Sequence, residues 1–126
     1  MSDRHEEGMR IRREVLGDDH VDAAIEKTTP ETEAFQDLIT RYAWGEIWAR
    51  PGLDRRTRSA ITLMALVALG RDHELAMHIR AAQRNGLTRE EIGEVLLQSA
   101  IYCGVPAGNR AFAIFRDVLA EEEGQG

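Results

Sequence analysis

The stretch from Gly70 to Gly86 predicts one helix with a glycine at each end. At 3.6 residues per turn, Leu75, Ile79 and Ala82 form an apolar stripe along one side of this helix. Nowhere in the sequence do apolar and polar residues alternate over a stretch long enough for a half-buried strand. We therefore expect an all-α fold, a helical bundle built from helix hairpins.

The preceding part of the chain predicts a charged arm and then a longer helix. Residues 5–27 have few apolar positions, and a turn at Gly17 divides them into two short helices. We expect this arm, residues 1–30, to pack on the outside of the domain or on a neighbouring subunit. Residues 33–48 then predict one helix with an aromatic end. Its apolar positions are Phe35, Leu38, Ile39, Tyr42 and Trp44.

Three further helices follow from caps and apolar spacing. One begins after Asp54 as its N-cap, and from Ser59 to Leu69 it has small and branched residues on every side, so we expect it to be nearly buried. The next begins at Thr88, where Glu91 completes a capping box. The last helix ends in an acidic tail, residues 121–123, which we expect to fray.

Length and composition exclude several classes of protein. The 126 residues suit one domain, residues 1–126, and the net charge of -6 argues against nucleic-acid binding. The longest apolar run, Leu63 to Leu69, is too short to span a membrane. A single cysteine, Cys103, excludes an internal disulfide, and the first residues lack the apolar core of a signal peptide. We expect a cytoplasmic protein without a membrane or nucleic-acid partner.

Ionisable residues lie along one border of the apolar stripe. Arg71, Glu74 and His78 follow each other at i, i+3 and i+7 spacing and therefore share a helix edge. At the border of a cleft, such groups can be partly desolvated and have their pKa values shifted. The alternative is that Glu74 and His78 form an ordinary surface pair at i, i+4 spacing, which this helix alone favours.

Both tryptophans lie close to a glycine and a Pro-Gly turn. Trp44, Glu46, Trp48 and Arg50 occur within seven positions of one another. Indole rings can form the apolar walls of a pocket, and an arginine can bind an anion there. The alternatives are that the two rings close a helix end as core aromatics and that Glu46 forms a helix-terminal salt bridge.

Five fragments together resemble one known family. They are Trp44-Gly-Glu-Ile-Trp48, the run from Arg50 to Ser59, Glu74-Leu-x-x-His78, the run from Asn85 to Leu97, and the run from Ile101 to Ala107. In this order and with short gaps, they resemble the carboxymuconolactone decarboxylase family over nearly all of the chain after Thr32. The resemblance implies an alkylhydroperoxidase-like helical fold.

The wider superfamily contains thiol peroxidases whose site is Cys-x-x-Cys followed after three residues by His. When His78 is aligned with that histidine, Arg71 and Glu74 occupy the two cysteine positions. Peroxide reduction through a disulfide needs an attacking and a resolving thiol. The resemblance therefore does not extend to that activity, and Cys103 stands alone.

The family resemblance implies decarboxylation of 4-carboxymuconolactone to 3-oxoadipate enol-lactone, in the β-ketoadipate pathway of aromatic catabolism. The electrons released with CO2 can spread through a double bond to the lactone carbonyl, so the resemblance implies no cofactor and no metal. The substrate would be a small lactone dicarboxylate. The family also implies a homo-oligomer, a hexamer arranged as a ring of dimers.

The resemblance suggests roles for the acidic and imidazole groups. His78 is the first choice for the general acid, because an imidazole titrates near neutral pH. Glu74 could orient His78 or share its proton, and Glu46 is a candidate acid beside the departing carboxylate.

The expected substrate-binding residues are Arg71, Arg50, Arg56, Trp44 and Trp48. Arginines suit a dianion because each can bind a carboxylate with two hydrogen bonds. The alternative function is that of a catalytically inactive family member, which binds a small carboxylic acid or serves as an oligomeric assembly protein.

Overall fold

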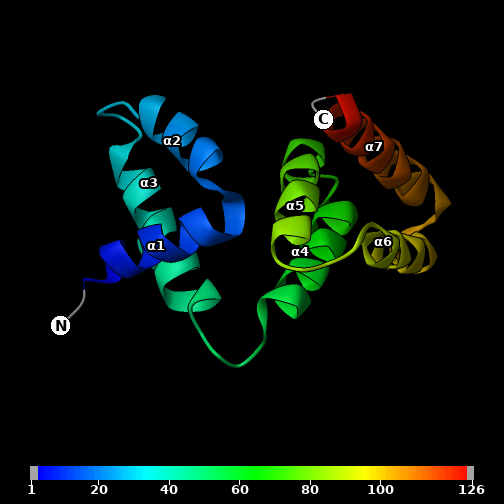
Figure 1. Ribbon diagram of the computed structural model, residues 1–126, viewed down its shortest axis with the longest axis horizontal. Helices are drawn as coiled ribbons and strands as arrows, with labels where there is room; N and C mark the ends of the chain where they lie inside the picture. The colour runs from blue at the N-terminus through cyan, green and yellow to red at the C-terminus, as the bar shows by residue number, and fades with distance from the viewer. Residues whose placement is uncertain (1–2, 125–126) are drawn as a thin grey trace. The chain divides into compact units, whose positions relative to one another are not determined.

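The computed structural model describes residues 3–124, and the regular elements in this range are helices (Figure 1). The all-α prediction is confirmed. The chain divides between Asp54 and Arg55 into two compact units, which we describe separately. A single domain over residues 1–126 stays a prediction. The first two residues of the expected N-terminal arm and the last two residues of the chain lie outside the described residues.

The first unit contains α1 (Arg4–Leu16), α2 (Asp18–Glu26), α3 (Glu33–Ile39) and η1, a π-helix (Thr40–Trp48). The two short helices expected within residues 5–27 are confirmed as α1 and α2, with Gly17 between them at a φ of 94°. In Figure 1, α1 crosses the continuous α3–η1 segment.

The crossing of α1 and η1 brings two backbones close together. A Cβ atom on Gly8 would overlap the backbone carbonyl of Thr40, and one on Gly45 would lie 2.7 Å from the carbonyl oxygen of Arg4. Glycines at both positions therefore permit this approach. The N-terminal arm thus packs against η1 within its own unit.

The prediction of one α-helix over residues 33–48 is wrong in its second half. The helix widens at Thr40 into nine residues of π-helix. The buried residues of this π-helix are Thr40 and Trp44, which are four positions apart and lie on one face. Three of the five expected apolar positions are exposed in this unit: Phe35 and Leu38 of α3 by 60% and 58%, and Tyr42 of η1 by 62%.

The second unit contains α4 (Arg55–Leu69), α5 (Asp72–Arg84), α6 (Arg89–Cys103) and α7 (Val105–Gly124). The tight turn between α4 and α5 contains Gly70, whose φ of 69° is easily adopted only by glycine. The capping box between Thr88 and Glu91 is confirmed at the start of α6. The segment expected to be one helix between Gly70 and Gly86 is α5.

The core of the second unit is assembled from all four of its helices. The predicted stripe of Leu75, Ile79 and Ala82 is buried. The expectation that α4 is nearly buried is wrong, because the other three helices cover only one of its sides and Ile61 is 54% exposed. No helix within residues 3–124 is long and apolar enough to cross a membrane. The other large core side chains are Leu63, Val67, Leu87, Ile92, Leu96, Phe115 and Val118.

The expectation that residues 121–123 fray is also wrong, since α7 continues to Gly124. Each of the three glutamates in this tail binds a side chain on another helix. Arg80 Nη2 donates to Glu121 Oε2 at 2.8 Å, Gln83 Nε2 donates to Glu122 Oε1 at 2.9 Å, and Arg89 Nη1 donates to Glu123 Oε1 at 3.2 Å. These contacts hold the last turn of α7 against α5 and α6.

Candidate active site

His78 lies on α5 at the border between the buried stripe and the surface. Leu75 and Ile79, its neighbours on the helix, are 2% and 0% exposed, whereas His78 is half-buried. Its Nδ1 atom is shielded from solvent. This environment is suitable for a proton donor, because one edge of an imidazole held against a core can still face a ligand.

Arg71 and Glu74 lie at the beginning of the same helix. The backbone N–H of Leu75 donates to the Arg71 carbonyl at 2.8 Å, and Glu74 lies in the first turn. Both side chains are exposed. Glu74 and His78 therefore lie on one helix, as predicted, whereas Arg71 is the N-cap residue, with a φ of -93° and a ψ of 79°, and lies outside the helix.

Arg56 binds two other residues of the second unit. Its guanidinium donates to the Gly86 carbonyl oxygen and forms an ion pair with Glu91. The hydrogen bond from Arg56 is the main reason that the pKa of Glu91 lies below its usual value. Arg56 thus fastens the start of α4 to the turn between α5 and α6, and its role as a carboxylate binder stays a prediction.

The two tryptophans contact each other in the first unit. Their ring centroids are 5.3 Å apart with an interplanar angle of 33°. Trp44 is 5% exposed, which agrees with the interpretation of this residue as a core aromatic, and Trp48 is half-buried. Such a tilted pair stabilises the end of η1 and leaves one ring partly accessible.

Glu46 and Arg50 lie on the same segment. Glu46 forms an ion pair with Arg4 of α1, as the salt-bridge alternative predicted. Arg50 follows η1 and is exposed. These two residues and the tryptophans belong to the first unit, whereas His78 belongs to the second. Among the predicted residues of the first unit, the structure brings Trp44 and Trp48 into contact.

A cavity of about 620 Å³ lies in the first unit, and none of the predicted site residues lines it. One of its lining residues is Arg12, a buried arginine that the sequence analysis did not single out. A signal was present in the sequence: Gly8, Ile11, Arg12 and Val15 follow helical spacing, and all four are buried. An arginine within such a stripe indicates a charge that folding removes from water.

Within residues 3–124, no three His, Cys, Asp or Glu side chains are close enough together to hold a metal ion. Cys103, the last residue of α6, is half-buried and reduced.

Comparison with known proteins connects these observations to a family. The family described as "CMD: Carboxymuconolactone decarboxylase family" matches residues 33–117. The chain is 44% identical over 118 residues to the 4-carboxymuconolactone decarboxylase of Acinetobacter baylyi, covering 94% of this chain and 88% of that one. It is 41% identical over 114 residues to the nitrosuccinic acid decarboxylase npaB of Metarhizium robertsii, covering 90% and 80%.

A shorter match is to the 4-carboxymuconolactone decarboxylase of Pseudomonas putida, at 49% identity over 43 residues, which covers 34% of this chain and 90% of that sequence. The matches to the Acinetobacter and Metarhizium proteins include both of the units described above, and the family match includes α5 with His78. The chain belongs to the carboxymuconolactone decarboxylase family, as its five ordered fragments predicted.

Proposed function

We propose that this protein is a carboxy-lyase that decarboxylates 4-carboxymuconolactone to 3-oxoadipate enol-lactone in aromatic catabolism. The observation that carries the proposal is the 44% identity to a 4-carboxymuconolactone decarboxylase along nearly the full length of both chains. The half-buried imidazole of His78, beside the exposed Arg71 and Glu74, supports it independently.

The proposed reaction breaks the bond between the γ-carbon of the lactone and its carboxylate. The electron pair of that bond passes through the ring double bond to the lactone carbonyl oxygen, and CO2 leaves. A proton then adds to the α-carbon of the resulting dienolate and completes the enol-lactone. Because the lactone accepts the electrons, the protein has to bind the dianion, stabilise the charge on oxygen and deliver one proton.

We assign the proton delivery to His78. A positioned general acid contributes about 10²- to 10⁴-fold in rate. Glu74 is one helical turn before His78 and can orient the imidazole or return its proton. Glu46, which forms an ion pair with Arg4, remains an alternative acid.

We assign the binding of the substrate carboxylates to arginine side chains. Arg71 is the first choice because it is exposed and directly precedes the helix that carries His78. Arg50 is the second, and Arg56 the third because Glu91 already binds it. Trp48, and to a lesser degree the more buried Trp44, would form an apolar wall.

The oligomeric state of the protein and its cellular compartment are also proposals. Ile101, Tyr102 and Val105 are 75%, 79% and 65% exposed at the turn between α6 and α7, which supports a homo-oligomer in which another subunit covers them. A hexamer would agree with the family resemblance. The single cysteine is compatible with the reducing cytoplasm.

The match to a nitrosuccinic acid decarboxylase favours a second candidate substrate. Nitrosuccinic acid is also a dicarboxylic acid, and its nitro group can accept the electron pair that decarboxylation releases. The same charge distribution in the protein would therefore suit either reaction. The two substrates must be compared directly.

The test follows the ultraviolet absorbance of freshly generated 4-carboxymuconolactone with purified protein, and CO2 release from nitrosuccinate in parallel. His78→Ala is expected to lose most of the turnover and to keep the helical circular-dichroism spectrum. His73→Ala is the matched control, because His73 is exposed on the same helix. Lactone decay no faster than in buffer would refute the proposed reaction, and turnover of nitrosuccinate alone would establish the second candidate.

A further inference from the structure

The cavity in the first unit is bounded by side chains of two kinds. Apolar side chains form much of its wall, and Arg12 supplies a positive charge. Its volume of about 620 Å³ lies within the range of about 300–1,000 Å³ that is typical of small-molecule sites. The apolar lining residues are Met9, Ile25, Pro30 and Ala34.

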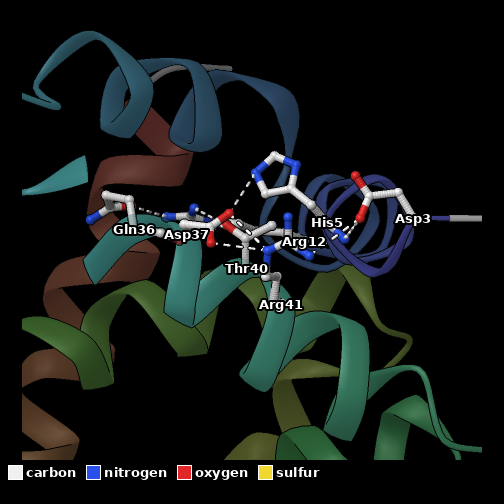
Figure 2. A network of polar contacts seen from close by, with 7 residues as sticks. All are labelled: Asp3, His5, Arg12, Gln36, Asp37, Thr40 and Arg41. Atoms are coloured by element: carbon white, nitrogen blue, oxygen red, sulfur yellow. Dashed lines mark hydrogen bonds and ion pairs between the residues drawn. The ribbon is translucent and has the colours of Figure 1, made fainter. Parts of the chain in front are cut away.

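Arg12 is buried without an acidic partner. The residue is 7% exposed. Its Nη1 atom donates to Thr40 Oγ1 and its Nη2 atom donates to Gln36 Oε1, each at 3.2 Å (Figure 2). Both acceptors are neutral, and Arg12 forms no ion pair within residues 3–124. Burial lowers the pKa of the Arg12 guanidinium, because removal from water disfavours its charged form.

The donors of Arg12 are also incompletely used. A guanidinium has five N–H groups, of which the two hydrogen bonds account for two. Nε is buried and donates to no atom of the described residues. Thr40 fixes the position of the group, because its own hydroxyl donates to the Gln36 carbonyl at 2.9 Å and presents a lone pair to Arg12. Arg12 is therefore held in place, but among the described residues some of its N–H donors have no acceptor and no acidic side chain balances its charge.

The acidic groups at the cavity are arranged differently. Asp37 binds Arg41 Nε at 2.9 Å and lies 3.6 Å from His5 Nε2, so its partners are residues other than Arg12 (Figure 2). Glu33 lines the same cavity and is exposed. A ligand with one carboxylate can bind Arg12, whereas a second carboxylate on that ligand would lie among these acids.

We propose that the cavity lined by Arg12 binds a small monocarboxylate, with its carboxylate on the guanidinium and its apolar body against Met9, Ile25 and Ala34. The site differs from the proposed active site, because none of the residues assigned to catalysis lines it. An Arg–carboxylate pair, which can be bidentate, would supply the charge compensation that the protein itself lacks there.

The charge class of this ligand matches the product of the proposed reaction, which has one carboxylate where the substrate has two. The site would then respond to product and not to substrate. This last step rests on the proposed function, whereas the binding of a monocarboxylate does not.

The experiment titrates the full chain by calorimetry with benzoate, benzamide and phthalate. These probes share a ring and differ in charge. Benzoate is expected to bind at least about tenfold more tightly than either of the others, the difference that one charged hydrogen bond supplies. Equal binding of benzamide, or no benzoate binding at millimolar concentration, would overturn the proposal.

Two variants link the binding to Arg12. Arg12→Met removes the charge and keeps most of the stem, and we expect it to weaken benzoate binding at least about tenfold. Arg10→Met is the matched control on the same helix, because Arg10 is exposed, binds Glu7 and Glu14, and does not line the cavity. Unchanged benzoate affinity in Arg12→Met would refute the site.

Gln36→Glu keeps the test decisive if Arg12→Met folds poorly. A carboxylate at position 36 would replace the amide that now accepts from Arg12 Nη2. We expect it to compensate the buried charge from within, to raise the melting temperature and to abolish benzoate binding. Benzoate binding of native strength in a folded Gln36→Glu protein would contradict the proposal.

Discussion

Gly8→Ala tests the close crossing of α1 and η1. Alanine favours a helix over glycine by about 1 kcal/mol, so the substitution would stabilise an open helix. At Gly8, however, the added Cβ would overlap the backbone carbonyl of Thr40. Overpacking typically costs about 1–3 kcal/mol, and a backbone atom cannot rotate away as a side chain can. Because the overlap is with backbone atoms, we expect a cost in the upper part of this range, about 2–3 kcal/mol, and hence a net destabilisation of about 1–2 kcal/mol.

Gly93→Ala is the matched control. Gly93 also lies within a helix, α6, but a Cβ there would meet only Phe115, at 4.0 Å. We expect this variant to gain up to about 1 kcal/mol from helix propensity alone. The same substitution should therefore have opposite effects at the two positions.

The assay is thermal unfolding followed by calorimetry and by circular dichroism. At roughly 4 °C per kcal/mol, Gly8→Ala should lower the melting temperature by about 4–8 °C and Gly93→Ala should raise it by up to about 4 °C. If the chain is one domain, both variants shift a single transition. A melting temperature of Gly8→Ala equal to or above that of the native protein would refute the crossing as described.

Three other predictions concern the second unit and the proposed active site. Ile79→Ala should destabilise by about 2–5 kcal/mol in urea unfolding, because Ile79 is fully buried in the core, and a loss below about 1 kcal/mol would contradict its position there. The pKa of Glu91 is lowered in the folded state, so its contribution is present above the pKa of the unfolded chain, about 4.3, and is lost as the pH falls through the folded value. Native protein should therefore lose more stability than Glu91→Gln between about pH 5 and about pH 3, and parallel curves would refute the Arg56–Glu91 contact. Arg71→Ala should raise KM for the lactone more than it lowers kcat if Arg71 binds a substrate carboxylate, and an unchanged KM would move that role to Arg50.

Much of the second unit could be predicted from the sequence. The stripe of Leu75, Ile79 and Ala82, the turn at Gly70 and the capping box at Thr88 depend on residues within a few positions of one another. The position of Glu74 and His78 one turn apart on α5 follows from the same helical geometry.

Some features of both units were not predicted because they depend on distant partners. The burial of Arg12 depends on Thr40, 28 residues away, and the last turn of α7 depends on Arg80, 41 residues before Glu121. No local pattern contains that information. Helical spacing likewise cannot predict whether Trp48 and Glu46 lie near His78, because these residues belong to different units.

The amino-acid sequence alone was sufficient for the helical class, most helix boundaries and the family, because periodicity, caps and ordered motifs are properties of short segments. Tertiary packing determined which side of each helix is buried, where the helix after Thr40 widens, and that an arginine lies in a cavity without an acidic partner. These features arise when segments far apart in the chain exclude water together, and only the folded arrangement specifies which segments meet.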